Sequence, residues 1–240
     1  MKKLLLCLLS VCLLCACNRE NDEPVLPNPE PTPEVEQAPL TLFVYLVADT
    51  NIKTDLRNNI KHMFKGLSDM DKRATLLVYW DGGGSDTYFE TSPCILKFET
   101  DGLGNVNGVA SRDSMYTIRQ VADFAETVKS YPSMKSTDKS AMTAILKDMA
   151  SFAPTDRYGF VAGSHGSAWL NSIYGYKASR AFGQDGDGSD FSITTPDMAD
   201  SFENAGLHFD FLLFDACMMG TVEVCYDFRE VVDYLIVSAL

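Results

Sequence analysis

One cysteine and one histidine in this sequence have the surroundings that nucleophilic catalysis requires. Cys217 follows the apolar run Phe209–Phe214, and His165 follows the apolar run Tyr158–Gly163. A thiolate is a strong nucleophile, and an imidazole can carry its proton near neutral pH. If the two runs are neighbouring parallel strands, both side chains emerge at the carboxyl edge of the sheet, where open α/β sheets place their sites.

The other two histidines fit this chemistry poorly. His208 precedes Cys217 by nine residues on the same predicted strand, which at ~3.3 Å per residue separates them by about 30 Å. His62 falls in a predicted surface helix and is interpreted as a solvated side chain. A cysteine at a strand end is also commonly a small buried hydrophobic residue. The catalytic interpretation of Cys217 therefore depends on His165 as its base.

The residues after Cys217 predict a helix. Apolar positions recur at helical spacing between Thr221 and Val232, just after Gly220. We therefore expect Cys217 to lie beside a helix N-terminus, where the helix dipole favours the thiolate.

Three segments resemble the clostripain family of cysteine endopeptidases, which belongs with caspases, gingipains, legumains and separase. They are Gly163-Ser-His-Gly-Ser-Ala-Trp169, Phe214-Asp-Ala-Cys-Met-Met-Gly-Thr-Val-Glu-Val224 and Val232-Asp-Tyr-Leu-Ile-Val-Ser238. The histidine precedes the cysteine by 52 residues, in the order that caspases also use. The resemblance extends over roughly residues 39–240.

The resemblance implies an endopeptidase that cleaves after Arg or Lys. Cys217 would attack the scissile carbonyl and His165 would protonate the leaving amine. The backbone N–H groups of Gly166 and Cys217 would hold the oxyanion. Asp215 would lie at the floor of the primary specificity pocket and select a basic side chain. The other interpretation of Asp215 is a helix or turn cap.

A polar, glycine-rich stretch at residues 174–190 lies between the two catalytic candidates and predicts a loop. Lys177 and Arg180 are the only basic residues between His165 and Arg229. Because clostripain-like zymogens are cut after a basic residue in this region, the resemblance implies self-cleavage after Lys177 or Arg180.

We expect that the protein requires no cofactor. Calcium is the one metal ion whose binding the sequence leaves as an open alternative. Asp185, Asp187 and Asp190 offer carboxylates, and some family members use calcium. Their spacing fails the EF-hand pattern because no Glu stands at its twelfth position. We therefore assign no metal ligands.

A catalytically silent surface lipoprotein that uses the same fold to bind peptides or proteins is the alternative function. Two departures from the family support it. The chain ends at Leu240, where the family continues, so we expect a partial domain. Ser164 stands where relatives often carry Asn or Asp before the histidine.

The first 16 residues predict a lipoprotein signal peptide. A basic start precedes the apolar segment Leu4–Leu14, which is too short to span a bilayer. Leu14-Cys-Ala-Cys17 resembles a bacterial lipobox, which implies that Cys17 is lipidated and becomes the mature N-terminus. A plain signal peptide is the other interpretation.

Residues 17–39 predict an extended, proline-rich acidic linker. At ~3.1 Å per residue it reaches about 60 Å from the membrane. The acidic Glu20-Asn-Asp-Glu23 resembles the surface-export signal of some Gram-negative lipoproteins. We therefore expect a lipid-anchored protein in the outer membrane or at the cell surface of a Gram-negative bacterium.

Residues 40–240 predict one α/β domain with a doubly wound, mainly parallel sheet flanked by helices, and the resemblance to the clostripain family implies that this fold is caspase-like. Apolar runs and helical periodicity indicate the following elements: strands at residues 40–48, 75–80, 95–98, 158–163 and 209–214, and helices at 52–67, 113–131 and 140–152.

The net charge limits the classes of molecule that the protein can bind, and the cysteine count bears on whether it contains disulfides. The net charge of −13 falls by two, to −15, when Lys2 and Lys3 leave with the signal peptide, so nucleic acid is an unfavourable partner and basic peptides suit the surface. The mature cysteines are too few for a disulfide framework, and Cys225 is expected to pack within its helix. We expect a monomer acting on peptide or protein substrates that contain Arg or Lys.

Overall fold

The computed structural model describes residues 39–84, 86–167, 181–186 and 192–239, all within the compact unit Ala38–Leu240. Its strands are β1 Leu40–Val47, β2 Ala74–Asp81, β3 Cys94–Thr100, β4 Asn105–Val106, β5 Val109–Ala110, β6 Glu126–Ser130, β7 Tyr158–Gly163, β8 Ala181–Phe182, β9 Ile193–Thr194, β10 Phe209–Asp215 and β11 Val232–Ile236. Its helices are α2 Lys53–Asp69, α3 Ile118–Phe124, α4 Lys139–Phe152, α5 Thr195–Ala205 and α6 Val222–Phe228.

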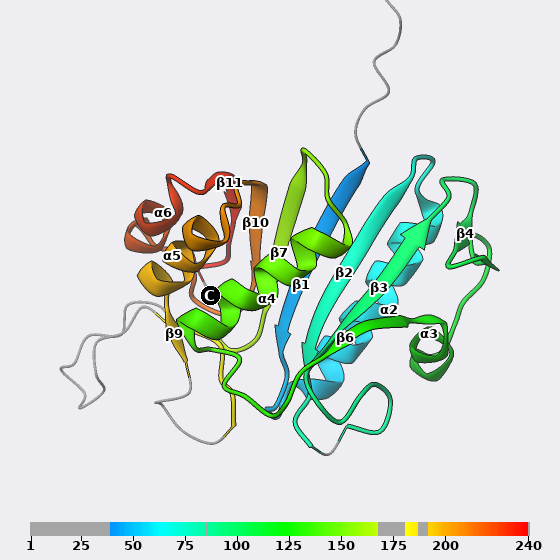
Figure 1. Ribbon diagram of the computed structural model, residues 1–240, viewed down its shortest axis with the longest axis horizontal. Coiled ribbons are helices and arrows are strands. Elements are labelled where there is room, and N and C mark those ends of the chain that lie inside the picture. Colours follow the sequence, from blue (N-terminus) through cyan, green and yellow to red (C-terminus); the bar gives the residue numbers. More distant parts are fainter. Residues whose placement is uncertain (1–38, 85, 168–180, 187–191, 240) are drawn as a thin grey trace, which may run out of the picture. The chain divides into compact units, whose positions relative to one another are not determined.

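The main sheet has the order β11-β10-β7-β1-β2-β3-β4-β5, with β6 also paired to β3 (Figure 1). The pairs from β11 to β2 are all parallel, whereas β3 to β6 pair in the antiparallel sense. The predicted α/β class with a mainly parallel sheet is therefore confirmed.

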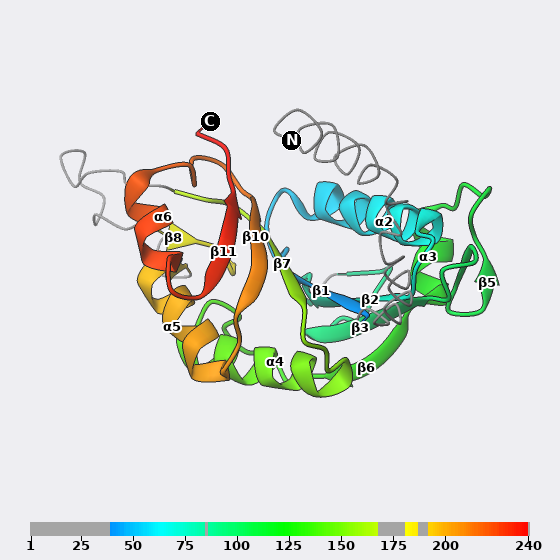
Figure 2. The same ribbon diagram turned by 90° about the horizontal axis from the view of Figure 1, so that it is seen from above.

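Helices cover both faces of the sheet, with α2 on one side and α4 and α5 on the other (Figure 2). The alternating side chains of β1 show why the sheet needs a layer of helices on each face. Phe43 and Tyr45 pack toward the α4 and α5 side, while Val44 and Leu46 pack toward α2. Because successive side chains of a strand point to opposite faces, an apolar strand needs cover on both.

Capping residues fix both ends of α5 and the short connection from α5 to β10. The side chain of Thr194 accepts a hydrogen bond from Asp197 N, and Pro196 occupies the first turn. Gly206 then ends the helix in the left-handed conformation, with φ 73°. The chain therefore reverses within three residues and enters β10 at Phe209.

The predicted helix over residues 113–131 is wrong. Only Ile118–Phe124 is helical, beginning at a capping box in which Thr117 and Gln120 exchange hydrogen bonds. Ala125 is extended, and the next residues form β6 against the edge of β3. Thr127 and Val128 are β-branched and suit a strand, so pairing with β3 overrides the helical periodicity.

The helix predicted from Thr221 to Val232 is shorter than expected. It ends at Phe228, and Val232 begins β11. The prediction that Cys225 is packed within its helix is also wrong, because its side chain is exposed. The buried stripe of α6 consists of Val224 and Phe228, four residues apart, and Cys225 lies outside it.

Strand β10 is less covered than its apolar sequence suggests. Phe211 and Leu213 are only half-buried on the α2 side, and on the neighbouring β11 Tyr234 and Ile236 are exposed. Strand β11 is the last strand of the sheet and β10 is its neighbour, and both lie away from β1 and β2, whose side chains α2 covers.

The β4–β5 hairpin is absent from the sequence predictions. Asn107 and Gly108, both with positive φ, form its two-residue turn, and Asn-Gly is the strongest short hairpin signal. The described helices include none that is both long enough and apolar enough to cross a bilayer.

Candidate active site

Strands β7 and β10 are adjacent and parallel, and their register aligns the two catalytic candidates. Gly163 stands opposite Asp215, and His165 and Cys217 each follow two residues later. Both residues therefore leave the same edge of the sheet on neighbouring strands, which confirms the predicted strand arrangement.

The backbone beyond the two strands is in close contact. A Cβ added to Gly166 would lie 2.3 Å from the carbonyl oxygen of Cys217 and 3.0 Å from Sδ of Met219. Met218 has a φ of 62°, a left-handed conformation that is uncommon for a residue other than glycine. The turn around Cys217 is therefore tightly folded against Gly166, which only glycine accommodates without a shift.

His165 is half-buried, and its ring is hydrogen-bonded to a residue from the turn after β1. The distance from His165 Nε2 to Asn51 Oδ1 is 2.8 Å. Sequence reasoning did not single out Asn51. The available signal was that β1 is the other neighbour of β7, so a polar residue just after β1 meets the same edge.

Ser164 fixes the backbone just before the histidine. Its hydroxyl donates to the carbonyl oxygen of Val47 at 2.8 Å and accepts from the Gln184 amide at 3.2 Å. Because Ser164 is almost fully buried, both bonds are shielded from water. Ser164 therefore ties the end of β7 to the end of β1 and to the segment at residues 181–186.

The segment at residues 181–186 runs antiparallel to the chain around Gly166. Ser167 N donates to Ala181 O at 3.0 Å, and Gly183 N donates to His165 O at 2.9 Å. These bonds flank the bridge between Gly166 and Phe182. In such a pair the central residue does not bond its partner, so the Gly166 amide points away from residues 181–183.

Asp215 is exposed at the end of β10 on the α2 side of the sheet. Its Oδ2 accepts a hydrogen bond from Asn59 Nδ2 of α2 at 2.5 Å. The helix-cap interpretation of Asp215 is wrong, because Thr221 caps α6 by accepting from Val224 N.

Cys217 is exposed, and the helix that follows it starts where it was predicted, with Thr221 as its N-cap. Helix α6 begins at Val222, five residues after Cys217. The dipole effect is confined to the first turn of a helix, so it does not account for a reactive thiol here. Residues 217 and 218 form a turn, and residues 219 and 220 connect it to Thr221, the N-cap of α6.

Two carboxylates, those of Asp185 and Asp81, accept hydrogen bonds from Ser136 near this edge. The Ser136 amide donates to Asp185 Oδ2 at 2.5 Å, and its hydroxyl donates to Asp81. Burial, and then the charge of Asp81, raise the pKa of Asp185 from 3.8 to about 6. Burial likewise raises the pKa of Asp81, with the charge of Asp49 contributing.

The remaining predicted positions fall partly outside the described residues. Cys17, Lys177, Arg180, Asp187 and Asp190 all lie there. Within the part of the chain that the structure describes, no three His, Cys, Asp or Glu side chains form a group that could hold a metal ion.

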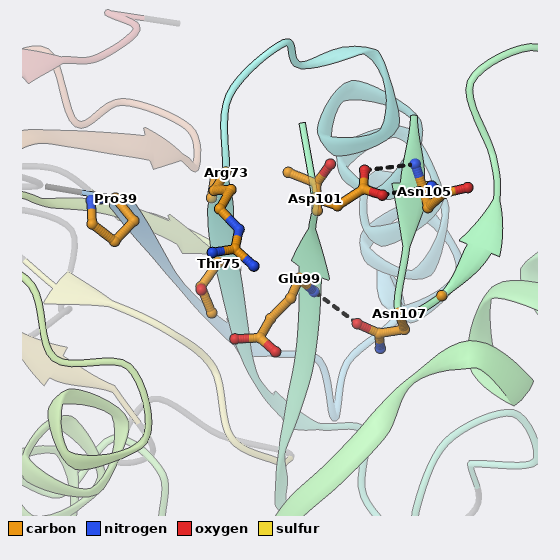
Figure 3. Close-up of a pocket in the computed structure, with 10 residues that line it drawn as sticks. Pro39, Arg73, Thr75, Glu99, Asp101, Asn105 and Asn107 are labelled. Carbon is orange, nitrogen blue, oxygen red and sulfur yellow. Dashed lines mark hydrogen bonds between the residues drawn. The ribbon is translucent and has the colours of Figure 1, made fainter. Parts of the chain in front are cut away.

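A separate open pocket of about 670 Å³ lies at the start of β2 and the end of β3 (Figure 3). Arg73, Glu99 and Asp101 line it, and Asp101 binds the side chain of Asn105 at 2.5 Å. The parallel β1–β2 pair places the start of β2 opposite Leu40, at the far edge from His165. This pocket is therefore separate from the candidate active site.

A parallel sheet that carries a histidine and then a cysteine at the ends of two adjacent strands defines the caspase-like class of α/β proteins. Residues 44–240 match the sequence profile of the clostripain family, Peptidase C11. The chain belongs to this family.

Solved structures of the same family share the fold. A secreted C11 cysteine protease from Bacteroides thetaiotaomicron, in complex with an irreversible peptide inhibitor, is 28% identical with a TM-score of 0.60, over 84% of this chain and 49% of that one. The protease iotapain from the same species is 24% identical with a TM-score of 0.61, over 85% and 53%. An inactive zymogen C11 protease from Parabacteroides distasonis is 24% identical with a TM-score of 0.58, over 83% and 48%.

The chain thus spans about half the length of these relatives. A comparison with curated proteins found no match.

Proposed function

We propose that this protein is a cysteine endopeptidase that cleaves peptide bonds after Arg or Lys through a dyad of Cys217 and His165. The observation that carries the proposal is the register of β7 and β10, which aligns the two residues at one edge. The contact between Gly166 and the Cys217 backbone brings their turns together. Membership of a cysteine peptidase family supports the same reading.

The reaction proceeds in two halves. The Cys217 proton passes to His165, and the thiolate attacks the scissile carbonyl carbon, forming a C–S bond and an oxyanion. The oxyanion collapses, the C–N bond breaks, and the imidazolium gives its proton to the leaving amine. Water then attacks the thioester and loses a proton to His165. The C–S bond breaks, the proton returns from His165 to the Cys217 sulfur, and the carboxylate product is released.

Backbone amides stabilise the oxyanion in this proposal. The Gly166 amide points away from residues 181–183, so that ladder does not use it. The Cys217 amide belongs to the turn in contact with Gly166. Fixed donors of this kind contribute most when they are positioned before charge develops.

Asp215 provides the preference for a basic side chain. It is two residues from the nucleophile, and its oxygen is held by Asn59 at 2.5 Å. A carboxylate oriented in this way matches the guanidinium of Arg and the ammonium of Lys. The formal net charge of −13 further favours basic peptides over acidic ones.

A mass-shift experiment tests the proposed function. A peptide acyloxymethylketone ending in Arg should add once to the chain, because the thiolate displaces the carboxylate leaving group to form a thioether. The adduct should be absent in Cys217→Ala. Cys225→Ala is the matched control, because Cys225 is also a free exposed thiol, and it should label like the wild type.

Two further parts of this experiment test the preference for a basic side chain and the alternative function as a silent peptide-binding protein. Asp215→Asn should slow labelling by the Arg reagent about 100-fold, since an ion pair is lost, and leave a Leu-ended reagent nearly unaffected. Labelling on Cys225, or a folded chain that takes up no reagent, would contradict the proposal. A folded, unreactive chain would favour the silent peptide-binding lipoprotein.

We also propose that the protein is matured by self-cleavage after Lys177 or Arg180, and that lipid on Cys17 anchors it to the outer membrane or cell surface. The basic preference of the site and the two lone basic residues between His165 and Arg229 support the first step. The sequence Leu14-Cys-Ala-Cys17 supports the second, as does the secreted state of a family member.

A further inference from the structure

The imidazole of His165 has a side-chain partner that the mechanism above does not use. Asn51 Oδ1 lies 2.8 Å from His165 Nε2, within the range of a good hydrogen bond. Asn51 belongs to the turn between β1 and α2, and it is exposed. Three different elements therefore meet at the dyad, namely the ends of β1, β7 and β10.

We propose that Asn51 is a positioning residue for the dyad histidine: its amide oxygen accepts the Nε2 hydrogen and leaves Nδ1 to exchange the proton with Cys217 and the leaving amine. This inference rests on the proposed function for its catalytic consequence. The hydrogen bond itself is independent of that function.

The chemistry of the two groups fixes the direction of this bond in the charged state. An imidazolium carries hydrogens on both nitrogens, so only the amide oxygen of Asn51 can satisfy Nε2. In the neutral ring, a hydrogen held on Nε2 leaves the lone pair on Nδ1. The same contact thus serves both protonation states that the reaction visits.

The Asn51 side chain presents an amide dipole to His165 and carries no net charge. An amide keeps accepting the hydrogen bond over the whole pH range because it does not titrate. It also stabilises the imidazolium less than a carboxylate would, so the proton remains easy to transfer.

Several charged groups surround the dyad. Asp49 and Lys53 flank Asn51 and lie 3.8 Å apart, Asp215 stands at the end of β10, and Asp185 lies on the segment that bonds the His165 backbone. Among the residues that the structure describes, Asn51 is the one that hydrogen-bonds to the His165 ring.

Kinetics with two substitutions separate positioning from mere support of the fold. Asn51→Ala should lower kcat for an Arg substrate by about 10- to 100-fold with little change in KM, because the base is misoriented. Asn51→Asp should recover part of the rate, and it should move the alkaline limb of the kcat/KM profile upward by about one pH unit. Asn58→Asp, a neutral-to-acidic change on α2, is the control and should leave rate and profile unchanged.

An activity-independent readout tests the contact itself. The chain contains three histidines, so nitrogen-15 histidine labelling gives few imidazole signals, which His62→Gln and His208→Gln assign. The wild type should show neutral His165 with its hydrogen on Nε2, and Asn51→Ala should show a mixture of both tautomers.

The outcomes distinguish the two proposals. An active wild type whose rate, profile and tautomer are unchanged in Asn51→Ala would overturn the positioning role alone. A wild type that takes no reagent on Cys217 but shows the Nε2 tautomer, lost in Asn51→Ala, would support the positioning contact and overturn the proposed function. A wild type with the hydrogen on Nδ1 would overturn the inference whatever its activity.

Discussion

Gly166 shows how a single missing side chain shapes the site. Its space is taken by the Cys217 carbonyl, 2.3 Å from where a Cβ would stand. Any side chain at this position must push the histidine turn and the cysteine turn apart, so the spacing of thiol and imidazole depends on this glycine.

Gly166→Ala should therefore leave the chain folded while it disables the site. We expect Cys217 to react with the Arg acyloxymethylketone about 100-fold more slowly, since a displacement near 1 Å can cost that factor. Gly66→Ala is the matched control, because nothing lies within 4 Å of its Cβ position, and alanine there should raise stability by about 1 kcal/mol with reactivity unchanged. Equal reactivity of wild type and Gly166→Ala would contradict the argument.

The sequence singles out some residues of the candidate site and not others. His165 and Cys217 could be found because each follows an apolar run, and the structure places both runs side by side. Asn51 and Asn59 were not singled out, because single asparagines in a turn and a helix carry no periodic signal; for Asn51 only the neighbourhood of β1 and β7 pointed to this edge. Their roles depend on contacts more than 100 residues apart in the chain.

Elements near the site are held together by buried polar groups as well as by apolar packing. The loop before α4 and the segment at residues 181–186 meet where Ser136 donates to Asp185. Burial of this carboxylate raises its pKa from 3.8 to about 6. The native chain therefore holds this proton up to about pH 6, whereas the unfolded chain loses it near pH 4. Stability must fall as the pH rises between these values.

Asp185→Asn removes this penalty and retains an acceptor for the Ser136 amide. Because Asp185 is only half-buried, solvent screening limits the gain to about 1 kcal/mol, or roughly 2–4 °C in Tm at pH 7.5. The gain should be mostly lost near pH 4, where the wild-type carboxyl is protonated in the native chain and about half protonated in the unfolded one. Thermal melts at the two pH values, with exposed Asp71→Asn as control, measure it; a gain of equal size at pH 4 would refute the assignment.

Strands and helices with strong patterns were predicted well, and the failures have a common cause. The runs that became β1, β2, β7 and β10 are apolar and central, so their own sequence specifies them. The segment at Glu126–Ser130 became a strand because the edge of β3 was available, which periodicity does not reveal. The helix predicted from Thr221 to Val232 is shorter because Val232 pairs with Phe209 of β10 and begins β11.

At the scale of the whole molecule, the proposed lipid anchor predicts where the protein is found. Cys17→Ala should move it from the membrane fraction to the soluble fraction, since acyl chains supply the anchoring free energy. Cell fractionation followed by immunoblotting measures this, and Cys15→Ala is the control that should stay in the membrane fraction. Unchanged membrane association of Cys17→Ala would contradict lipidation at this residue.

Self-cleavage predicts the covalent form of the purified protein. The wild type should separate into two chains on a denaturing gel, because a tethered cleavage site has an effective concentration in the millimolar range. Cys217→Ala should stay whole, and Lys177→Ala/Arg180→Ala should stay whole while still reacting with the Arg reagent. Cleavage of purified Cys217→Ala at the wild-type rate would assign the cut to another protease.

The pairing of β7 with β10 gives such a cut an additional meaning. The two strands lie side by side within the sheet, yet Lys177 and Arg180 come between them in sequence. A break at either residue would therefore leave a heterodimer whose interface lies inside a single sheet, between β7 and β10, with the histidine on one polypeptide and the cysteine on the other. Such halves would separate only on unfolding, and activity recovered by mixing the two denatured fragments would be fragment complementation, second order in concentration.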